Sequence, residues 1–304
     1  MNLLRTPDER FENLPDFPFE PHYIEVDDIR IHYVDEGSND EEVVLLMHGE
    51  PSWSFLYRHM IPPLVEAGFR VVAPDLVGFG RSDKPTEQSD HTYAKHVEWM
   101  TKWMVSLDLQ NITLFCQDWG SLIGLRMAIE NQDRFKRIVL SNGGLPTGEI
   151  FVGDARSGNR ERFKQWRKTS RETPVFATKF FFQAASFTRL SRDVLKAYEA
   201  PFPDASYQAG ARIMPSLVPI TPDDPEHERN TKAQEKFKQW NKPFLTAFAD
   251  SDPITGGGDV LWHELVPGTK GQKQTTIKNA SHFIQEDAAP ELAEIIINFI
   301  KDNP

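Results

Sequence analysis

The sequence predicts an α/β fold in which helices cover both faces of a mostly parallel central sheet. Short apolar segments alternate with helix-like segments across residues 43–142, and the connections between them are short. This alternation stops in residues 147–225, which contain no valine-rich buried strand, and resumes afterwards. We therefore predict one core built from residues 1–146 and 226–304, with residues 147–225 inserted as a helical cap.

Composition places the chain among ordinary globular proteins. Its 304 residues are 39% hydrophobic and 26% charged, enough for one large core. The formal net charge of −11 argues against a nucleic-acid or anionic-membrane partner. We expect no signal peptide, because the N-terminal residues lack an apolar run. We expect no membrane span, because no apolar run approaches the roughly 18 residues that a span needs. The single cysteine, Cys116, excludes internal disulfides and indicates a reducing compartment, so we expect the cytoplasm.

The N-terminal part predicts an arm followed by the edge of the sheet. The first twenty or so residues are polar and proline-rich, which is typical of an arm lying over the surface. Residues 22–26 and 29–34 alternate between apolar and polar side chains, as in a β-hairpin. Residues 43–47 are continuously apolar, which favours a strand covered on both faces.

The next elements keep the alternation of helix and strand. Residues 53–64 are aromatic and capable of forming a helix, and residues 70–75 read as another buried strand. In residues 93–107 apolar side chains recur at helical intervals, with Trp99 and Trp103 on one face. After residue 110 come the remaining predicted elements: a strand ending near 117, a helix over 121–131, a strand over 137–142, cap helices over 160–168, 175–185 and 192–200, a proline-rich return over 214–225, strands over 243–248 and 274–277, and a final helix over 289–300.

The turn centred on Asp118 is the first candidate for chemistry. A strongly apolar strand runs into this carboxylate, and a helix-like pattern starts directly after it. The small residues Cys116 and Gly120 lie two positions on either side, which is the spacing of a sharp strand-to-helix turn that presents a nucleophile. The alternative is that Asp118 only caps the helix that follows, because Asp is a good N-cap residue.

The order of further polar residues favours the catalytic interpretation. In an open α/β sheet, ligands bind outside the carboxyl ends of the strands. Asp250 and Asp252 follow a later strand, and His282 follows the last strand, just before the terminal helix. The order nucleophile, acid, histidine is that of the α/β-hydrolase triad. We therefore predict that Asp118 is a nucleophile, with either Asp250 or Asp252 as the acid.

Other kinds of site lack the necessary pattern. No two of the nine histidines have metal-ligand spacing. The Gly78–Gly80 pair lacks the third glycine of a dinucleotide-binding loop, and no lysine loop suited to phosphate is present. We expect neither a metal nor a cofactor.

Four motifs and one cap segment resemble the haloalkane dehalogenases, within an α/β-hydrolase fold that covers nearly the whole chain. The motifs are HGEPSW at 48–53, DLVGFGRSDKP at 75–85, QDWG at 117–120 and SHF at 281–283. The cap segment AYEAPFPD at 197–204 is similar to that of one subfamily. The first and third motifs are shared with epoxide hydrolases.

The resemblance implies a two-step mechanism. Asp118 would displace halide from carbon and form an ester, and His282 would then activate the water that hydrolyses this ester. Asp252, followed by proline, matches the acid motif better than Asp250 does. The related subfamily carries its acid where this chain has Asn142, which cannot act as a carboxylate.

The resemblance also implies groups that bind the oxyanion and the halide. The backbone N–H groups of Trp119 and Glu50 would form the oxyanion hole. Trp119 matches the first halide-binding tryptophan because it directly follows the nucleophile. An indole N–H suits a halide, since it is only a donor. The related subfamily has an asparagine where this chain has Glu50, and an ionised Glu50 would repel a halide. Trp166, the only tryptophan in the cap, is then the second donor, although some members place this tryptophan where the chain has residues 185–187.

The expected substrate is a small apolar haloalkane, with water as co-substrate and halide as product. The pocket is predicted to be lined by apolar cap residues, some of which only pack the cap on the core: Phe163, Phe176, Phe180, Phe181, Phe187, Met214 and Val218. An epoxide hydrolase is the nearest alternative and would need two cap tyrosines, for which only Tyr198 and Tyr207 are available. A binding protein without catalytic activity is the third hypothesis. We expect a monomer, the usual state in the family.

Overall fold

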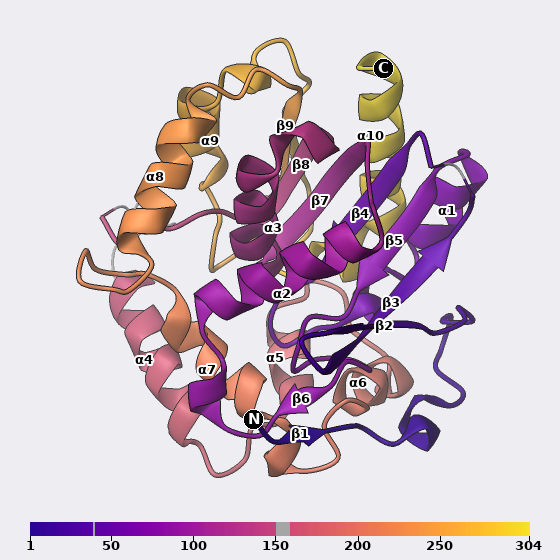
Figure 1. Cartoon of the computed structure of the whole chain (residues 1–304), viewed down its shortest axis with the longest axis vertical. Helices are drawn as coiled ribbons and strands as arrows, with labels where there is room; N and C mark the ends of the chain where they lie inside the picture. The colour runs from indigo at the N-terminus through magenta and orange to yellow at the C-terminus, as the bar shows by residue number, and fades with distance from the viewer. Residues whose placement is uncertain (39, 150–158) are drawn as a thin grey trace.

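The computed structural model describes residues 1–38, 40–149 and 159–304, and its centre is an eight-stranded sheet (Figure 1). The strand order is β10-β9-β8-β7-β4-β5-β3-β2, in which every pair from β10 to β5 is parallel and the edge formed by β3 and β2 is antiparallel. The mostly parallel sheet and the edge hairpin are as predicted. The strands are β2 (His22–Val26), β3 (Ile29–Glu36), β4 (Val43–Met47), β5 (Arg70–Pro74), β7 (Ile112–Asp118), β8 (Phe135–Gly143), β9 (Phe244–Ala249) and β10 (Thr275–Ile277).

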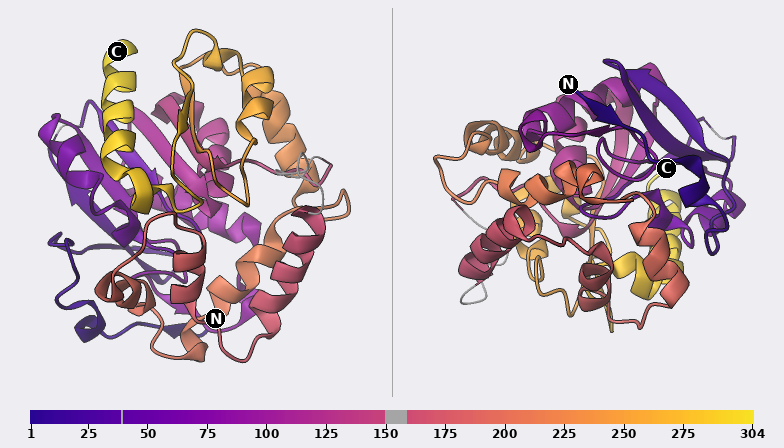
Figure 2. Two further views of the ribbon diagram at one scale, coloured as in Figure 1. Left: turned by 180° about the vertical axis from the view of Figure 1, so that it is seen from behind. Right: turned by 90° about the horizontal axis from the view of Figure 1, so that it is seen from below.

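Helices cover both faces of the sheet, which creates two apolar cores. Successive side chains of a strand point to opposite faces. In β4, Val43, Leu45 and Met47 therefore join one core, whereas Val44 and Leu46 join the other. Figure 1 shows α2 and α3 in front of the sheet, and the reverse view in Figure 2 shows α10 on the other side. The first core takes in α2 (Tyr93–Ser106), α3 (Trp119–Glu130), α8 (His227–Phe237) and α9 (Asp259–Leu265), and the second takes in α1 (Ile61–Glu66) and α10 (Ile284–Asp302).

Four helices between β8 and α8 gather beyond one end of the sheet (Figures 1 and 2). They are α4 (Asn159–Glu172), α5 (Thr178–Ala184), α6 (Arg192–Glu199) and α7 (Ala209–Leu217). The first three match the predicted cap helices, and residues 150–158 of the predicted cap lie outside the described part of the chain.

Three helices, α7, α8 and α9, were not anticipated from the pattern. Helix α7 occupies part of the segment predicted as a proline-rich return, and Pro215 lies inside it. Pro215 lies two residues before the end of α7. It lacks the N–H for one hydrogen bond within the helix, and this single loss does not break the helix. Helix α8 exposes most of its charged sequence and buries only Asn230, Ala233 and Phe237, which gives a weak apolar period.

The segment predicted as one helix over 53–64 is divided. A 3₁₀ turn covers Ser54–Tyr57, and α1 begins only at Ile61, directly before two prolines. The N-terminal arm is also more firmly attached than a surface arm, because β1 (Leu3–Leu4) pairs with β6 (Lys84–Pro85) and Phe11 is buried. No helix in the described ranges is both long and apolar enough to cross a membrane.

Candidate active site

The junction between β7 and α3 is a sharp turn with Asp118 at its apex. Asp118 has a φ of 49° and a ψ of −130°, and α3 begins at the next residue. A Cβ added to Gly120 would lie 1.9 Å from the Met47 carbonyl oxygen, so only glycine fits there. The Asp118 side chain makes no capping hydrogen bond to α3. This geometry supports the predicted nucleophile turn: Asp118 occupies the N-cap position, but its side chain does not cap the helix.

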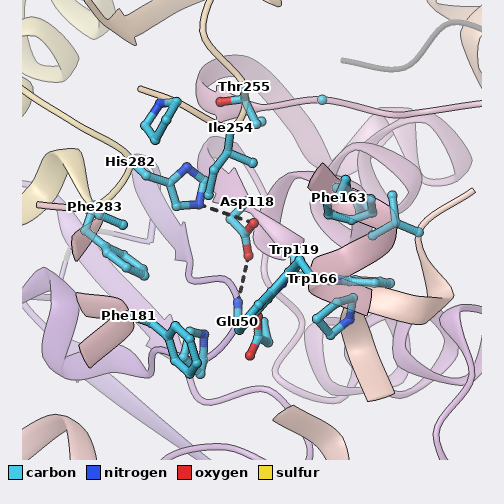
Figure 3. A pocket seen from close by; sticks show the side chains of 18 of the residues that line it. Glu50, Asp118, Trp119, Phe163, Trp166, Phe181, Ile254, Thr255, His282 and Phe283 are labelled. Atoms are coloured by element: carbon cyan, nitrogen blue, oxygen red, sulfur yellow. Dashed lines mark hydrogen bonds and ion pairs between the residues drawn. The ribbon is translucent and has the colours of Figure 1, made fainter. Parts of the chain in front are cut away.

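The two Asp118 carboxylate oxygens meet different partners. Oδ1 accepts a hydrogen bond of 2.8 Å from the backbone N–H of Glu50, and Oδ2 lies 3.4 Å from Nε2 of His282 (Figure 3). The close approach of the loop after β4 requires glycine at position 49, since a Cβ there would lie 2.3 Å from Asp118 Oδ1. One carboxylate is therefore held between a backbone donor and an imidazole.

The choice between the two candidate acids is decided by position. Asp252 is fully buried, and its carboxylate oxygens lie 3.1 and 3.2 Å from Nδ1 of His282. Asp252 also accepts hydrogen bonds from the Thr255 hydroxyl and, at 2.8 Å, from the Ile254 N–H. Asp250 instead accepts a hydrogen bond from Ser251 and is partly exposed. The structure brings Asp252, and not Asp250, to the histidine.

The charges around His282 set its protonation. Burial alone would lower the pKa of His282, but the nearby carboxylates of Asp252 and Asp118 raise it to about 10. The pKa of Asp252 is lowered: burial acts against the ionised form, but His282 and the hydrogen bond from Thr255 more than compensate. Before any reaction the histidine therefore carries a proton between two carboxylates.

Two side-chain amides hold the loop that carries His282, and these contacts were not predicted. Nδ2 of Asn142 donates to the backbone carbonyls of Ser281 and His282 at 2.8 and 3.1 Å, while its Oδ1 accepts from the Ala249 N–H at 2.8 Å. Nε2 of Gln117 donates to the His282 carbonyl at 3.2 Å. The only available signal was the position of both amides at the carboxyl ends of buried strands.

Asp118 and His282 line a cavity of about 390 Å³ between the cap and the sheet (Figure 3). Trp119 and Trp166 both line it, one from the turn after β7 and one from α4 in the cap. Predicted pocket residues Phe163, Phe181 and Val218 line it as well. Apart from Glu50, Asp118, Thr255 and His282, the walls are thus mostly apolar.

Four of the predicted pocket residues do not line the cavity. Phe176 and Met214 are buried behind the wall, where Phe176 packs against Trp166. Phe180 and Phe187 are 66% and 59% exposed, so their prediction as pocket residues was wrong. Neighbouring residues on a helix point about 100° apart, which is why Phe181 faces the cavity and Phe180 faces solvent.

Glu50 lines the cavity next to Asp118, but its environment disfavours a charge. Its side chain is buried, and Oε1 has no hydrogen-bond partner. Burial first, and the Asp118 charge second, raise the pKa of Glu50 well above its usual value. A neutral Glu50 would not repel a halide. Among the described residues, no group of three or more His, Cys, Asp or Glu is arranged to hold a metal.

Comparisons with known proteins identify the family of this chain. The family model of the α/β-hydrolase fold matches residues 42–289. The chain is 53% identical to a haloalkane dehalogenase from Psychrobacter cryohalolentis over the full length of both proteins. The chain belongs to the haloalkane dehalogenase family. A haloalkane dehalogenase from Mycobacterium marinum is 49% identical over 98% of this chain and 100% of its own.

A solved structure extends the family likeness to three dimensions. The tetrameric haloalkane dehalogenase from Paraglaciecola agarilytica superposes with a TM-score of 0.87, at 35% identity and with 97% of each chain covered. The family resemblance predicted from the four motifs is therefore confirmed, as is the α/β-hydrolase fold.

Proposed function

We propose that the chain hydrolyses haloalkanes to an alcohol and a halide through a covalent ester on Asp118. One observation carries the proposal: the Asp118 carboxylate, held by the Glu50 N–H and facing His282, lines a mostly apolar cavity that Trp119 and Trp166 also line. A carboxylate is ionised at neutral pH and needs no base to act as a nucleophile, unlike a serine.

In the first step, a carboxylate oxygen of Asp118 attacks the carbon that bears the halogen. A carbon–oxygen bond forms, the carbon–halogen bond breaks, and its electron pair leaves with the halide. The indole N–H groups of Trp119 and Trp166 donate hydrogen bonds to the departing anion. The product is an alkyl ester on the enzyme.

In the second step, water attacks the carboxyl carbon of this ester while His282 accepts its proton. The backbone N–H groups of Glu50 and Trp119 stabilise the oxyanion that forms. Collapse of the intermediate releases the alcohol, whose oxygen takes up the proton from His282. The carboxylic acid left on Asp118 then gives up the second proton of the water, which restores the carboxylate. The sum is haloalkane plus water giving alcohol, halide and a proton.

The two steps are coupled by charge. Esterification of Asp118 removes one of the two carboxylates that raise the pKa of His282. The imidazole is then able to lose its proton and act as a general base, with Asp252 holding its Nδ1 side.

The epoxide hydrolase alternative receives less support. Neither Tyr198 nor Tyr207 belongs to the residues that line the cavity, and the Tyr198 hydroxyl donates to Glu286. No tyrosine of the cavity wall could therefore protonate an alkoxide from an opened epoxide. A binding protein without activity is disfavoured because the nucleophile and the histidine are both present and in contact.

The proposal is tested by incubating the protein with 1-bromobutane and with 1,2-epoxybutane and measuring bromide and diol. Bromide should appear with the wild type and be lost in Asp118→Asn. Asp250→Asn, which changes the carboxylate that does not reach His282, is the matched control and should retain activity. Diol without bromide would establish the alternative.

A second experiment tests whether His282 acts only after the ester on Asp118 has formed. His282→Phe should still form the ester but fail to hydrolyse it, so the intact protein should gain the mass of the alkyl group. If the wild type turns over and this variant shows no adduct, His282 does not act after the ester.

We also propose that the chain works as a monomer in the cytoplasm. Its single cysteine is buried and unpaired, as suits a reducing compartment. The tetrameric relative makes the oligomeric state worth measuring directly, by light scattering after size-exclusion chromatography. A mass near 34.8 kDa is expected, and a mass near four times that value would overturn the monomer.

A further inference from the structure

Three backbone N–H groups from two distant segments converge on the carboxylate of Asp287, in the first turn of α10. Phe187 and Thr188, which follow α5 in the cap, donate at 2.9 and 2.7 Å. Ser281, the residue before the catalytic histidine, donates at 2.9 Å. A single carboxylate thus bonds to the cap and to the His282 loop at the same time.

A fourth hydrogen bond joins the same two segments directly. The backbone N–H of Phe283 donates to the Ala185 carbonyl at 3.1 Å. Ala185, His282 and Phe283 all line the cavity. Ala185 of the cap and His282 and Phe283 of the loop are therefore joined parts of the cavity wall. Asp287 bonds to the segments that carry them, 185–188 and 281–283.

The His282 loop is held from two sides. On the sheet side, the amides of Asn142 and Gln117 bond to its carbonyl oxygens. On the cap side, its N–H groups bond to Asp287 and Ala185. Because the sheet-side partners lie on buried strands whereas the cap-side partners belong to the cap and α10, only the second set can transmit a change in the cap to the histidine.

We propose that Asp287 is a positioning residue that fixes His282 for hydrolysis of the ester by coupling its loop to the cap. This inference rests on the proposed function. Formation of the ester requires Asp118 and the halide donors, and none of these bonds to Asp287. Hydrolysis of the ester requires His282 at the correct distance from water. Loss of Asp287 therefore slows the second step much more than the first.

The test measures the fraction of enzyme present as alkyl ester during turnover of 1-bromobutane, by rapid quenching and intact-protein mass spectrometry. Asp287→Ala should lower kcat by about tenfold to a hundredfold, because small misplacements of a catalytic group have effects of that size. The ester fraction should rise in parallel. Asp287→Asn keeps one acceptor oxygen and should lie between the wild type and the alanine variant.

The matched control is Asp204→Ala. Asp204 is also an acceptor for a backbone N–H, that of Ser206 at 2.8 Å, but it lies within the cap and none of its hydrogen bonds reaches the core. A purely structural role for Asp287 would lower the melting temperature and the yield of folded protein without raising the ester fraction above that of the control.

The outcomes separate the inference from the function on which it rests. If the wild type releases no bromide, the proposed function fails. If the wild type turns over and His282→Phe accumulates ester, but Asp287→Ala and Asp287→Asn keep the wild-type ester fraction, then the function stands and the role of Asp287 is overturned.

Discussion

At the scale of single residues, the charge of Asp118 affects both of its titratable neighbours in the cavity. It raises the pKa of His282, which favours the imidazolium, and it raises the pKa of Glu50, which favours the neutral acid. The Asp118 carboxylate thus faces an imidazole whose protonated form is favoured on one side and a carboxyl group whose neutral form is favoured on the other. Esterification cancels this influence at the moment when a neutral histidine is needed.

Trp166 is the proposed halide donor that comes from the cap, so its role is worth testing separately. Trp166→Phe keeps an aromatic ring against Phe181, 4.6 Å away between centroids, but removes the indole N–H. Since a hydrogen bond to a charged group contributes about 1.5–3 kcal/mol, bromide release should fall roughly tenfold to a hundredfold. Trp103→Phe is the control, because the buried indole nitrogen of Trp103 has no hydrogen-bond partner. Equal activity of the two variants would remove Trp166 from the halide site.

The buried Glu50 side chain should make the folding stability of the protein depend on pH. Its pKa is raised in the folded protein, so above the usual pKa the unfolded state ionises whereas the folded state retains the proton. Folding is therefore opposed as pH rises, by about 1.4 kcal/mol for each unit between the two pKa values. Glu50→Gln should unfold at higher denaturant than the wild type at pH 8, and this advantage should shrink toward pH 4.5.

The same variant separates the backbone of Glu50 from its side chain. Only the N–H of Glu50 bonds to Asp118, so Glu50→Gln should keep most of the bromide-releasing activity. A severe loss of activity with intact stability would show that the carboxyl group itself takes part in the reaction.

At the scale of elements, the turn between β7 and α3 depends on the close approach of β4. A Cβ at Gly120 would meet backbone atoms of Met47, which cannot move aside without displacing the strand. Gly120→Ala should therefore cost about 1–3 kcal/mol of stability and at least about tenfold in activity, because Asp118 shifts with the turn. Thermal unfolding and bromide release measure the two effects.

Gly124 provides the control on the same helix. A Cβ there would lie 3.2 Å from Leu114 Cδ2, the flexible end of a side chain. Gly124→Ala should therefore leave activity nearly unchanged, and the better helix propensity of alanine offsets the tighter contact. If both alanine variants behave alike, the constraint at Gly120 is not specific to the turn.

At the scale of the whole molecule, buried histidines make stability depend on pH in opposite directions. Burial lowers the pKa of His91 to about 4, and its partner His96 also has a pKa well below the usual value. A histidine with a lowered pKa contributes stability that is complete above pH 6.5 and is lost as pH falls, whereas His282 contributes stability that is lost as pH rises toward 10. Stability should therefore be greatest near neutral pH.

The acid side of this profile can be measured by urea unfolding between pH 7 and pH 4. His91 alone should cost about 3 kcal/mol over that range, because burial lowers its pKa from 6.5 to about 4. His91→Gln should flatten this acid loss, whereas His22→Gln, on the exposed end of β2, should not. Identical slopes for the wild type and His91→Gln would assign the acid loss to other groups.

Much of the fold could be predicted from local pattern because buried parallel strands have continuous apolar sequences. The strands β4, β5, β7 and β9 were found within about a residue or two of their limits for this reason. Helices α7 and α8 were missed because Pro215 reads as a breaker and because α8 has few buried residues. In both cases tertiary packing, and not the local pattern, stabilises the helix.

By itself, the sequence determined the chemistry: the spacing of small residues around Asp118, the order of acid and histidine along the chain, and motifs that resemble one family. Those features are local, and short segments carry them. Only the tertiary structure placed Asp252, which the motif had already favoured over Asp250, beside His282, showed that Phe181 and not Phe180 faces the cavity, and placed Asp287 between the cap and the His282 loop. These choices depend on side-chain direction and on contacts between segments as much as 100 residues apart. Asp118 combines both kinds of information. The short motif around it can be read from the sequence, whereas its partners Glu50 and His282 come from distant parts of the chain.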